Sequence, residues 1–147
     1  MSGKPTTAFA LVLAGGILVI INSILELVVG LIIRGVSPGE VVPFPAGMAL
    51  VMVQFLKIIL IVLGVVGTIV GLLMIIAATR INSGEPGKVR TWSVIGIILS
   101  VISILVAGGG FYVGFILGLV GGILGLTWKP AEAAPQPVAQ AQTPPPV

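Results

Sequence analysis

The amino-acid sequence predicts an all-α integral membrane protein, a four-helix bundle followed by a disordered tail. Of its 147 residues, 57% are hydrophobic and only 7% are charged, the mean hydropathy is +1.28, and the apolar residues gather in four runs. A soluble domain carries about 25% charged residues, so this chain cannot give a globule a charged surface. We expect a transmembrane domain over residues 1–129 and a disordered Ala/Pro/Gln-rich tail over residues 130–147.

The first two apolar runs cover residues 8–33 and 46–79. A spanning helix needs about 20 predominantly apolar residues, whereas a cleaved signal peptide has an apolar core of only about 7–15. The first run is therefore predicted to be an uncleaved span. The second run is longer than one span requires, so its helix is expected to tilt or to project beyond the hydrocarbon. Pro38, Pro43 and Pro45 predict an irregular connection between the two.

Two shorter runs, residues 92–107 and 111–128, flank three consecutive glycines. One helix through both runs would be about 54 Å long, which is far more than the hydrocarbon core of about 30 Å. The glycines are therefore expected to form the turn of a helical hairpin. Both a pair of short spans and a re-entrant hairpin fit this pattern.

The placement of lysine and arginine predicts the orientation in the membrane. With four spans, the N-terminus, the loop after the second helix and the C-terminus share one side. That side carries five basic residues and the opposite loop carries only Arg34; the five are Lys4, Arg80, Lys88, Arg90 and Lys129. Because cytoplasmic loops hold the excess of basic residues, we expect a multi-pass protein of the cell membrane with both termini in the cytoplasm.

Small residues recur at helical spacing along the predicted helices. In lipid, helices associate where small residues let two backbones approach closely. The glycines expected to pack helices in this way are Gly64, Gly67, Gly71, Gly114, Gly118, Gly121, Gly122 and Gly125, and those of the fourth helix form overlapping GxxxG steps. Two interpretations fit: packing inside one bundle, or self-association and docking onto a larger membrane complex.

Four polar residues interrupt the first two helices, namely Asn22 and Glu26 in the first and Gln54 and Lys57 in the second. Counted from the outer helix ends, Glu26 and Lys57 lie at matching depths. Ionisable groups inside a span cost about 2.5–3.5 kcal/mol each on insertion scales and usually pair. We therefore expect an interhelical ion pair within a four-residue polar cluster. The pair either fixes the helix register or serves a proton or ion relay or a polar pocket; Lys57 could instead snorkel to the interface.

Few residue types in the chain support chemistry. The absence of cysteine and histidine removes thiol and imidazole catalysis and the usual zinc sites. Three of the four glutamates fall in predicted loops or the tail, too dispersed for paired carboxylates. We therefore expect no enzyme, no cofactor and no metal site. The basic residues are scattered singly, which argues against a nucleic-acid partner; the expected partners are the lipid bilayer and a homo-oligomer or larger membrane complex.

These observations favour a non-enzymatic accessory or scaffold subunit that associates through its glycine-rich helix faces. The alternative is a small ion, proton or solute transport subunit that uses Glu26 and Lys57.

The C-terminal half resembles a known family pattern. The segment Arg90-Thr-Trp92-Ser-Val-Ile-Gly96 leads into a glycine-rich stretch that ends in Trp128-Lys129-Pro130. This placement of glycine and tryptophan is similar to small four-helix membrane proteins of unknown function of the DUF4064 type, from archaea and Gram-positive bacteria, over roughly residues 85–130. The resemblance implies a membrane location and four spans, and it brings no activity or site residue with it.

Overall fold

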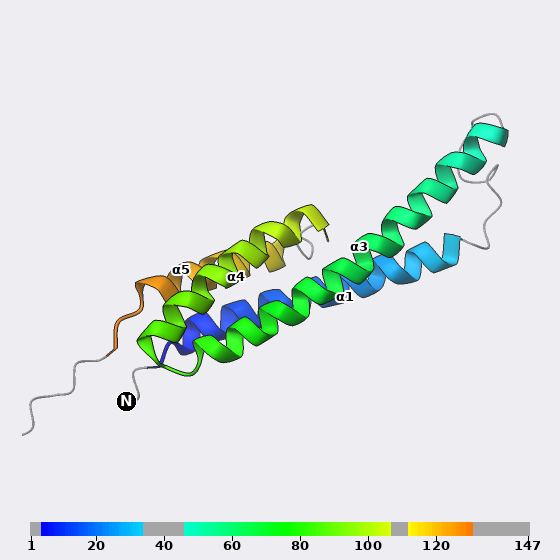
Figure 1. Ribbon diagram of the computed structural model, residues 1–147. Helices are drawn as coiled ribbons and strands as arrows, with labels where there is room; N and C mark the ends of the chain where they lie inside the picture. Colours follow the sequence, from blue (N-terminus) through cyan, green and yellow to red (C-terminus); the bar gives the residue numbers. More distant parts are fainter. Residues whose placement is uncertain (1–3, 34–45, 107–111, 131–147) are drawn as a thin grey trace, which may run out of the picture.

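A computed structural model of the chain describes residues 4–33, 46–106 and 112–130. These residues form four helices and no strand: α1 over Thr6–Ile32, α3 over Ala46–Ile81, α4 over Pro86–Val106 and α5 over Val113–Thr127 (Figure 1). The predicted all-α fold of four helices is thereby confirmed. The predicted tail after residue 130 lies outside the described residues.

The boundaries of α4 differ most from the prediction. The sequence predicted a loop up to residue 91, but α4 already begins at Pro86, and the Val89 amide donates to the Glu85 carbonyl at 2.8 Å. Proline is favoured in the first turn of a helix, because it has no N–H to leave unpaired and its φ suits the helix. The polar first turns of α4 therefore extend the helix beyond its apolar part.

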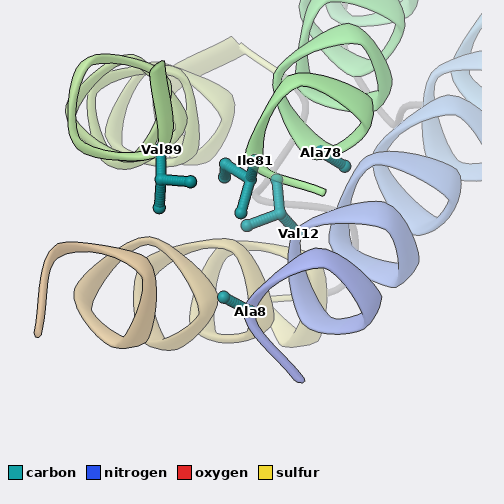
Figure 2. Packing of buried hydrophobic residues seen from close by; sticks show 5 residues of the cluster. All are labelled: Ala8, Val12, Ala78, Ile81 and Val89. Atoms are coloured by element: carbon teal, nitrogen blue, oxygen red, sulfur yellow. The ribbon is translucent and has the colours of Figure 1, made fainter. Parts of the chain in front are cut away.

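The four helices form a ring in which each packs against two neighbours. α1 lies between α3 and α5, and α4 completes the ring between the same two helices. Figure 2 shows this arrangement at one end of the bundle, where Ala8, Val12, Ala78, Ile81 and Val89 form a buried cluster. Trp92 and Trp128 pack against that cluster. This end therefore has a closed apolar core.

The helices differ greatly in length. α3 has 36 residues and α5 has 15, which correspond to about 54 Å and about 22 Å of helix. Consequently the α4–α5 hairpin covers only part of the α1–α3 pair, and the rest of that pair projects beyond the hairpin (Figure 1). We call this projecting part, which consists of the C-terminal end of α1 and the N-terminal half of α3, the outer arm. Three helices, α1, α3 and α4, are long and apolar enough to cross a membrane, and α5 is shorter.

The antiparallel pair of α1 and α3 is joined at a reciprocal glycine contact. A Cβ on Gly16 would lie 3.1 Å from the Gly71 carbonyl oxygen, and a Cβ on Gly71 would lie 3.0 Å from the Gly16 carbonyl oxygen. Since helices in lipid gain little from apolar contact alone, such close backbone approach supplies much of the attraction between them. Gly16 and Gly71 therefore fix the register of the two longest helices.

The buried hydroxyl groups are mostly satisfied within their own helices. Ser23 donates to the Val19 carbonyl at 2.8 Å, and Ser100 donates to the Gly96 carbonyl at 2.7 Å. Ser103 likewise donates to the backbone of its own helix. A serine bonded to the preceding turn presents a small, largely apolar surface to its neighbours. These serines thus act as small packing residues.

Candidate functional site

Asn22 and Glu26 form a polar pair on one face of α1. The Asn22 Nδ2 group donates to Glu26 Oε1 at 3.0 Å, across one helical turn. The other carboxyl oxygen, Oε2, is buried and has no hydrogen-bond partner within the described part of the chain. A buried carboxyl oxygen without a partner is unusual, since burial of an unsatisfied polar atom costs about 1–3 kcal/mol. Glu26 is therefore the side chain inside the helices that most needs a functional or structural explanation.

The structure does not bring Lys57 to Glu26. A Cβ on Gly30 would contact Ile61, and a Cβ on Gly64 would contact Leu27. This antiparallel register places Lys57 level with the end of α1, about seven residues or roughly 10 Å further out than Glu26. Among the described residues, ions pair within 4.0 Å only at Lys88 and Glu85. The ion pair expected from the sequence is therefore not formed.

The predicted cluster fails for a simple geometric reason. Counting depth from the helix ends assumes that α1 and α3 have level outer ends, but α3 extends well beyond the end of α1 (Figure 1). Lys57 is half-buried on α3, and Gln54, about a turn further out, is exposed. The four-residue cluster thus separates into the Asn22–Glu26 pair on α1 and two residues further out on α3, Gln54 and Lys57.

The predicted packing glycines of α3 lie where small residues are needed. Gly64, Gly67 and Gly71 are all buried. A Cβ on Gly64 would lie 2.8 Å from the Ser23 carbonyl oxygen, so no larger residue fits without moving α1. Gly64 and Gly71 thus join α3 to α1 inside the chain.

The glycine-rich face of α5 is likewise buried within the chain, between α1 and α4. A Cβ on Gly121 would lie 2.9 Å from the Val12 amide nitrogen, and one on Gly122 would lie 3.1 Å from the Ser93 carbonyl oxygen. Gly114, Gly118 and Gly125 are buried as well. Of the two interpretations of these glycines, the structure displays packing inside one bundle.

Five of the six basic residues of the described chain gather at one end of the bundle, and the sixth, Lys57, lies far from it on α3. The start of α1, the turn between α3 and α4 and the end of α5 all lie at that end (Figure 1). Arg80 lies over the Trp92 ring, 5.9 Å from its centroid. Five basic residues belong to these segments: Lys4, Arg80, Lys88, Arg90 and Lys129. This grouping agrees with their predicted location on one side of the membrane.

A cavity of about 270 Å³, which the sequence did not predict, lies at this basic end. Its lining comes from the first residues of α1 and from Leu124 and Trp128 of the C-terminal end of α5. No local pattern predicts this cavity, because its two walls are more than 110 residues apart in the sequence. The one signal in the sequence was that Lys4 and Trp128 lie at the ends of the first and fourth predicted helices, both on the predicted cytoplasmic side.

The described residues contain no group of three or more His, Cys, Asp or Glu side chains that could hold a metal ion. The helices instead present apolar side chains outward along most of their length.

These features define a small helical membrane protein. DUF6114, a family of unknown function, matches residues 39–129, more than half of the chain, and the chain belongs to this family. The resemblance to the DUF4064 type is thereby corrected: the family is a different one, although it too has no known function. The match includes α3, α4 and α5 but not α1 with Asn22 and Glu26. No curated protein and no solved structure matches the chain.

Proposed function

We propose that this protein is a non-enzymatic accessory or scaffold subunit of a membrane complex. The observation that carries the proposal is the use of its small and polar residues for internal packing. Gly64 and Gly71 of α3 and several glycines of α5 meet neighbouring helices of the same chain, and buried serines bond to their own helices. Such a construction provides a stable bundle with an apolar exterior.

Association with other chains then uses the apolar exterior, because the glycine-rich faces are occupied inside the chain. Large apolar side chains are exposed on both the outer arm and the four-helix part, for example Phe55 at 66% and Ile98 at 52%. In lipid, such side chains serve equally to contact acyl chains and to contact another protein.

The proposal also includes an orientation. The basic end of the bundle faces the cytoplasm, as the bias of lysine and arginine favours. In this orientation the outer arm lies toward the opposite side of the membrane.

The absence of cysteine from the chain permits a direct test. Phe55→Cys and Ile98→Cys introduce single thiols on the outer arm and on α4, and a bifunctional maleimide is added to native membranes. Extraction in mild detergent and mass measurement then identify any cross-linked product. The proposal predicts a product with a second copy or a defined partner from at least one position. A monomer without partner at both positions, and in untreated extracts, would refute the scaffold function.

A second candidate function, proton or ion transport, is favoured by one observation, the buried Glu26 oxygen without a described partner. Carboxyl groups inside membrane helices commonly mark ion or proton pathways. Flux through proteoliposomes should then be lost in Glu26→Gln and retained in Glu85→Gln, a control at the exposed turn before α4. No flux in the unaltered protein, or equal flux in both variants, would exclude this role of Glu26.

A further inference from the structure

The cavity at the basic end is lined by both polar and apolar residues. The lining includes Lys4, Thr6 and Thr7, which are residues with an ammonium or a hydroxyl group, and the apolar residues Leu124 and Trp128. Pro5 and Ala8 complete the lining. At about 270 Å³, the space is slightly below the range of about 300–1,000 Å³ typical of sites for drug-sized molecules. It suits a small polar group attached to an apolar chain.

The position of the cavity along the bundle agrees with this chemistry. Trp128 is half-buried against the apolar cluster at this end, and tryptophan and lysine side chains are enriched where membrane helices meet the headgroup layer. Lys129 is exposed directly after Trp128. These residues are the ones expected at the depth of lipid headgroups, and the cavity lies among them.

Lys4 is well placed to act as the cationic group of the cavity. A Cβ on Gly84 would lie 3.4 Å from Lys4 Cγ, so the lysine stem passes beside the turn between α3 and α4. Lys88, at the same end, is instead paired with Glu85 at 2.8 Å. The two lysines thus differ in their surroundings, although they share one side of the membrane.

We propose that this cavity binds the phosphate of an anionic phospholipid headgroup. The Lys4 ammonium and the hydroxyl groups of Thr6 and Thr7 donate to the phosphate oxygens, and the lipid chain leaves along Leu124 and Trp128. Donors of this kind are the usual partners of phosphate, and anionic lipids predominate in the cytoplasmic leaflet. The inference rests on the proposed function only in taking the basic end as the cytoplasmic one.

Native mass spectrometry of the full chain in detergent tests the proposal. Phosphatidylglycerol and phosphatidylcholine with identical acyl chains are added at equal concentration. The unaltered protein should retain phosphatidylglycerol preferentially. Lys4→Gln should reduce that affinity at least about ten-fold, the factor expected when a direct hydrogen bond between charged groups is lost. Lys88→Gln, which removes an equal charge outside the cavity, should leave the affinity unchanged.

Three outcomes would overturn the proposal. Equal retention of the two lipids removes the anionic specificity. An equal loss in Lys4→Gln and Lys88→Gln shows a general attraction to the basic end without a site. Displacement of the lipid by the same concentration of glycerol 3-phosphate identifies a soluble phosphate ester as the ligand. Since lipid retention is measured on the purified protein, failure here is distinguishable from failure of the scaffold proposal, which concerns other chains.

Tryptophan fluorescence gives a second measurement that needs no change in the cavity. In a Trp92→Phe background, emission comes from Trp128 alone, because the chain has two tryptophans. Phosphatidylglycerol brominated near the headgroup should quench Trp128 more strongly than brominated phosphatidylcholine at the same mole fraction. Equal quenching by the two lipids would contradict a headgroup site beside Trp128.

Discussion

Gly15 offers the sharpest test of how closely the helices pack. In Gly15→Ala, the new Cβ would lie 2.7 Å from the Gly114 carbonyl oxygen and 3.0 Å from the Gly118 amide nitrogen. Both are backbone atoms, so no side-chain rotation relieves the contact. Ordinary van der Waals contact begins at 3.4 Å, and α5 would have to move by about 0.7 Å to restore it, forfeiting part of its remaining contacts with α1.

The control is Gly96→Ala on α4. Gly96 is also buried within a helix, but its new Cβ would meet only Val12 Cγ1, at 3.8 Å. Both variants gain the same helix propensity, up to about 1 kcal/mol, so their difference reports overpacking, typically about 1–3 kcal/mol. We expect Gly15→Ala to be less stable than Gly96→Ala by that amount, and Gly96→Ala to be at least as stable as the unaltered chain.

Reversible unfolding in mixed micelles of a mild detergent and SDS measures this difference. Trp92 and Trp128 report the state of the basic end, because both pack against its buried cluster. The analysis requires a two-state transition, which coincident fluorescence and circular dichroism curves establish. If the two variants unfold within about 0.5 kcal/mol of each other, the range of ordinary surface substitutions, the close approach of α1 and α5 is refuted.

Three further predictions concern single features of the bundle. Ser93 Oγ is buried without a hydrogen-bond partner among the described residues, so Ser93→Ala should stabilise the protein by about 1 kcal/mol in the same unfolding assay; a loss of stability would reveal a partner. Glu26→Gln and Lys57→Met should show additive effects on stability, within about 0.5 kcal/mol, because the register of α1 and α3 keeps the two side chains apart. A larger coupling energy would show that the two side chains do form an ion pair. If the basic end is cytoplasmic, a membrane-impermeant maleimide added to intact cells should label Met48→Cys and spare Ser83→Cys, and the reverse pattern would invert the orientation.

Much of the fold could be predicted from local signals in the sequence. Runs of apolar residues about as long as a bilayer is thick, with prolines and glycines between them, indicate four helices without any knowledge of tertiary contacts. The start of α4 at Pro86 was missed because the polar residues around it were interpreted as a loop. The composition of a segment does not show where a helix leaves the hydrocarbon.

The candidate sites depend on distances between helices, and these were harder to predict. Whether Glu26 meets Lys57 depends on the register at the contact of Gly16 with Gly71, and a change of one turn there moves every opposing pair. The glycines of α5 face α1 and α4 in the structure, but their spacing in the sequence does not distinguish a neighbour in the same chain from one in another chain. The cavity beside Lys4 could not be predicted, because it forms only where the start of α1 and the end of α5 lie together.

The extent of the family match leads to a last prediction about α1. Residues 39–129 contain the glycine faces of α3 and α5 but not the helix against which Gly71 and Gly121 pack, which is α1. The matched part is therefore not a complete packing unit: without α1, two surfaces suited to close helix contact face lipid.

We expect residues 39–147 expressed alone to form oligomers in mild detergent. Co-expression of residues 1–38 as a separate chain should restore the particle size of the intact protein. Gly15→Ala in the 1–38 chain should weaken the recovery of the intact particle size. Ile17→Ala in the same chain, at an exposed position of α1, should not. A monomeric, stable 39–147 fragment would show that α1 is an addition to a self-sufficient three-helix unit, and its Glu26 would then have to be explained apart from the packing of the bundle.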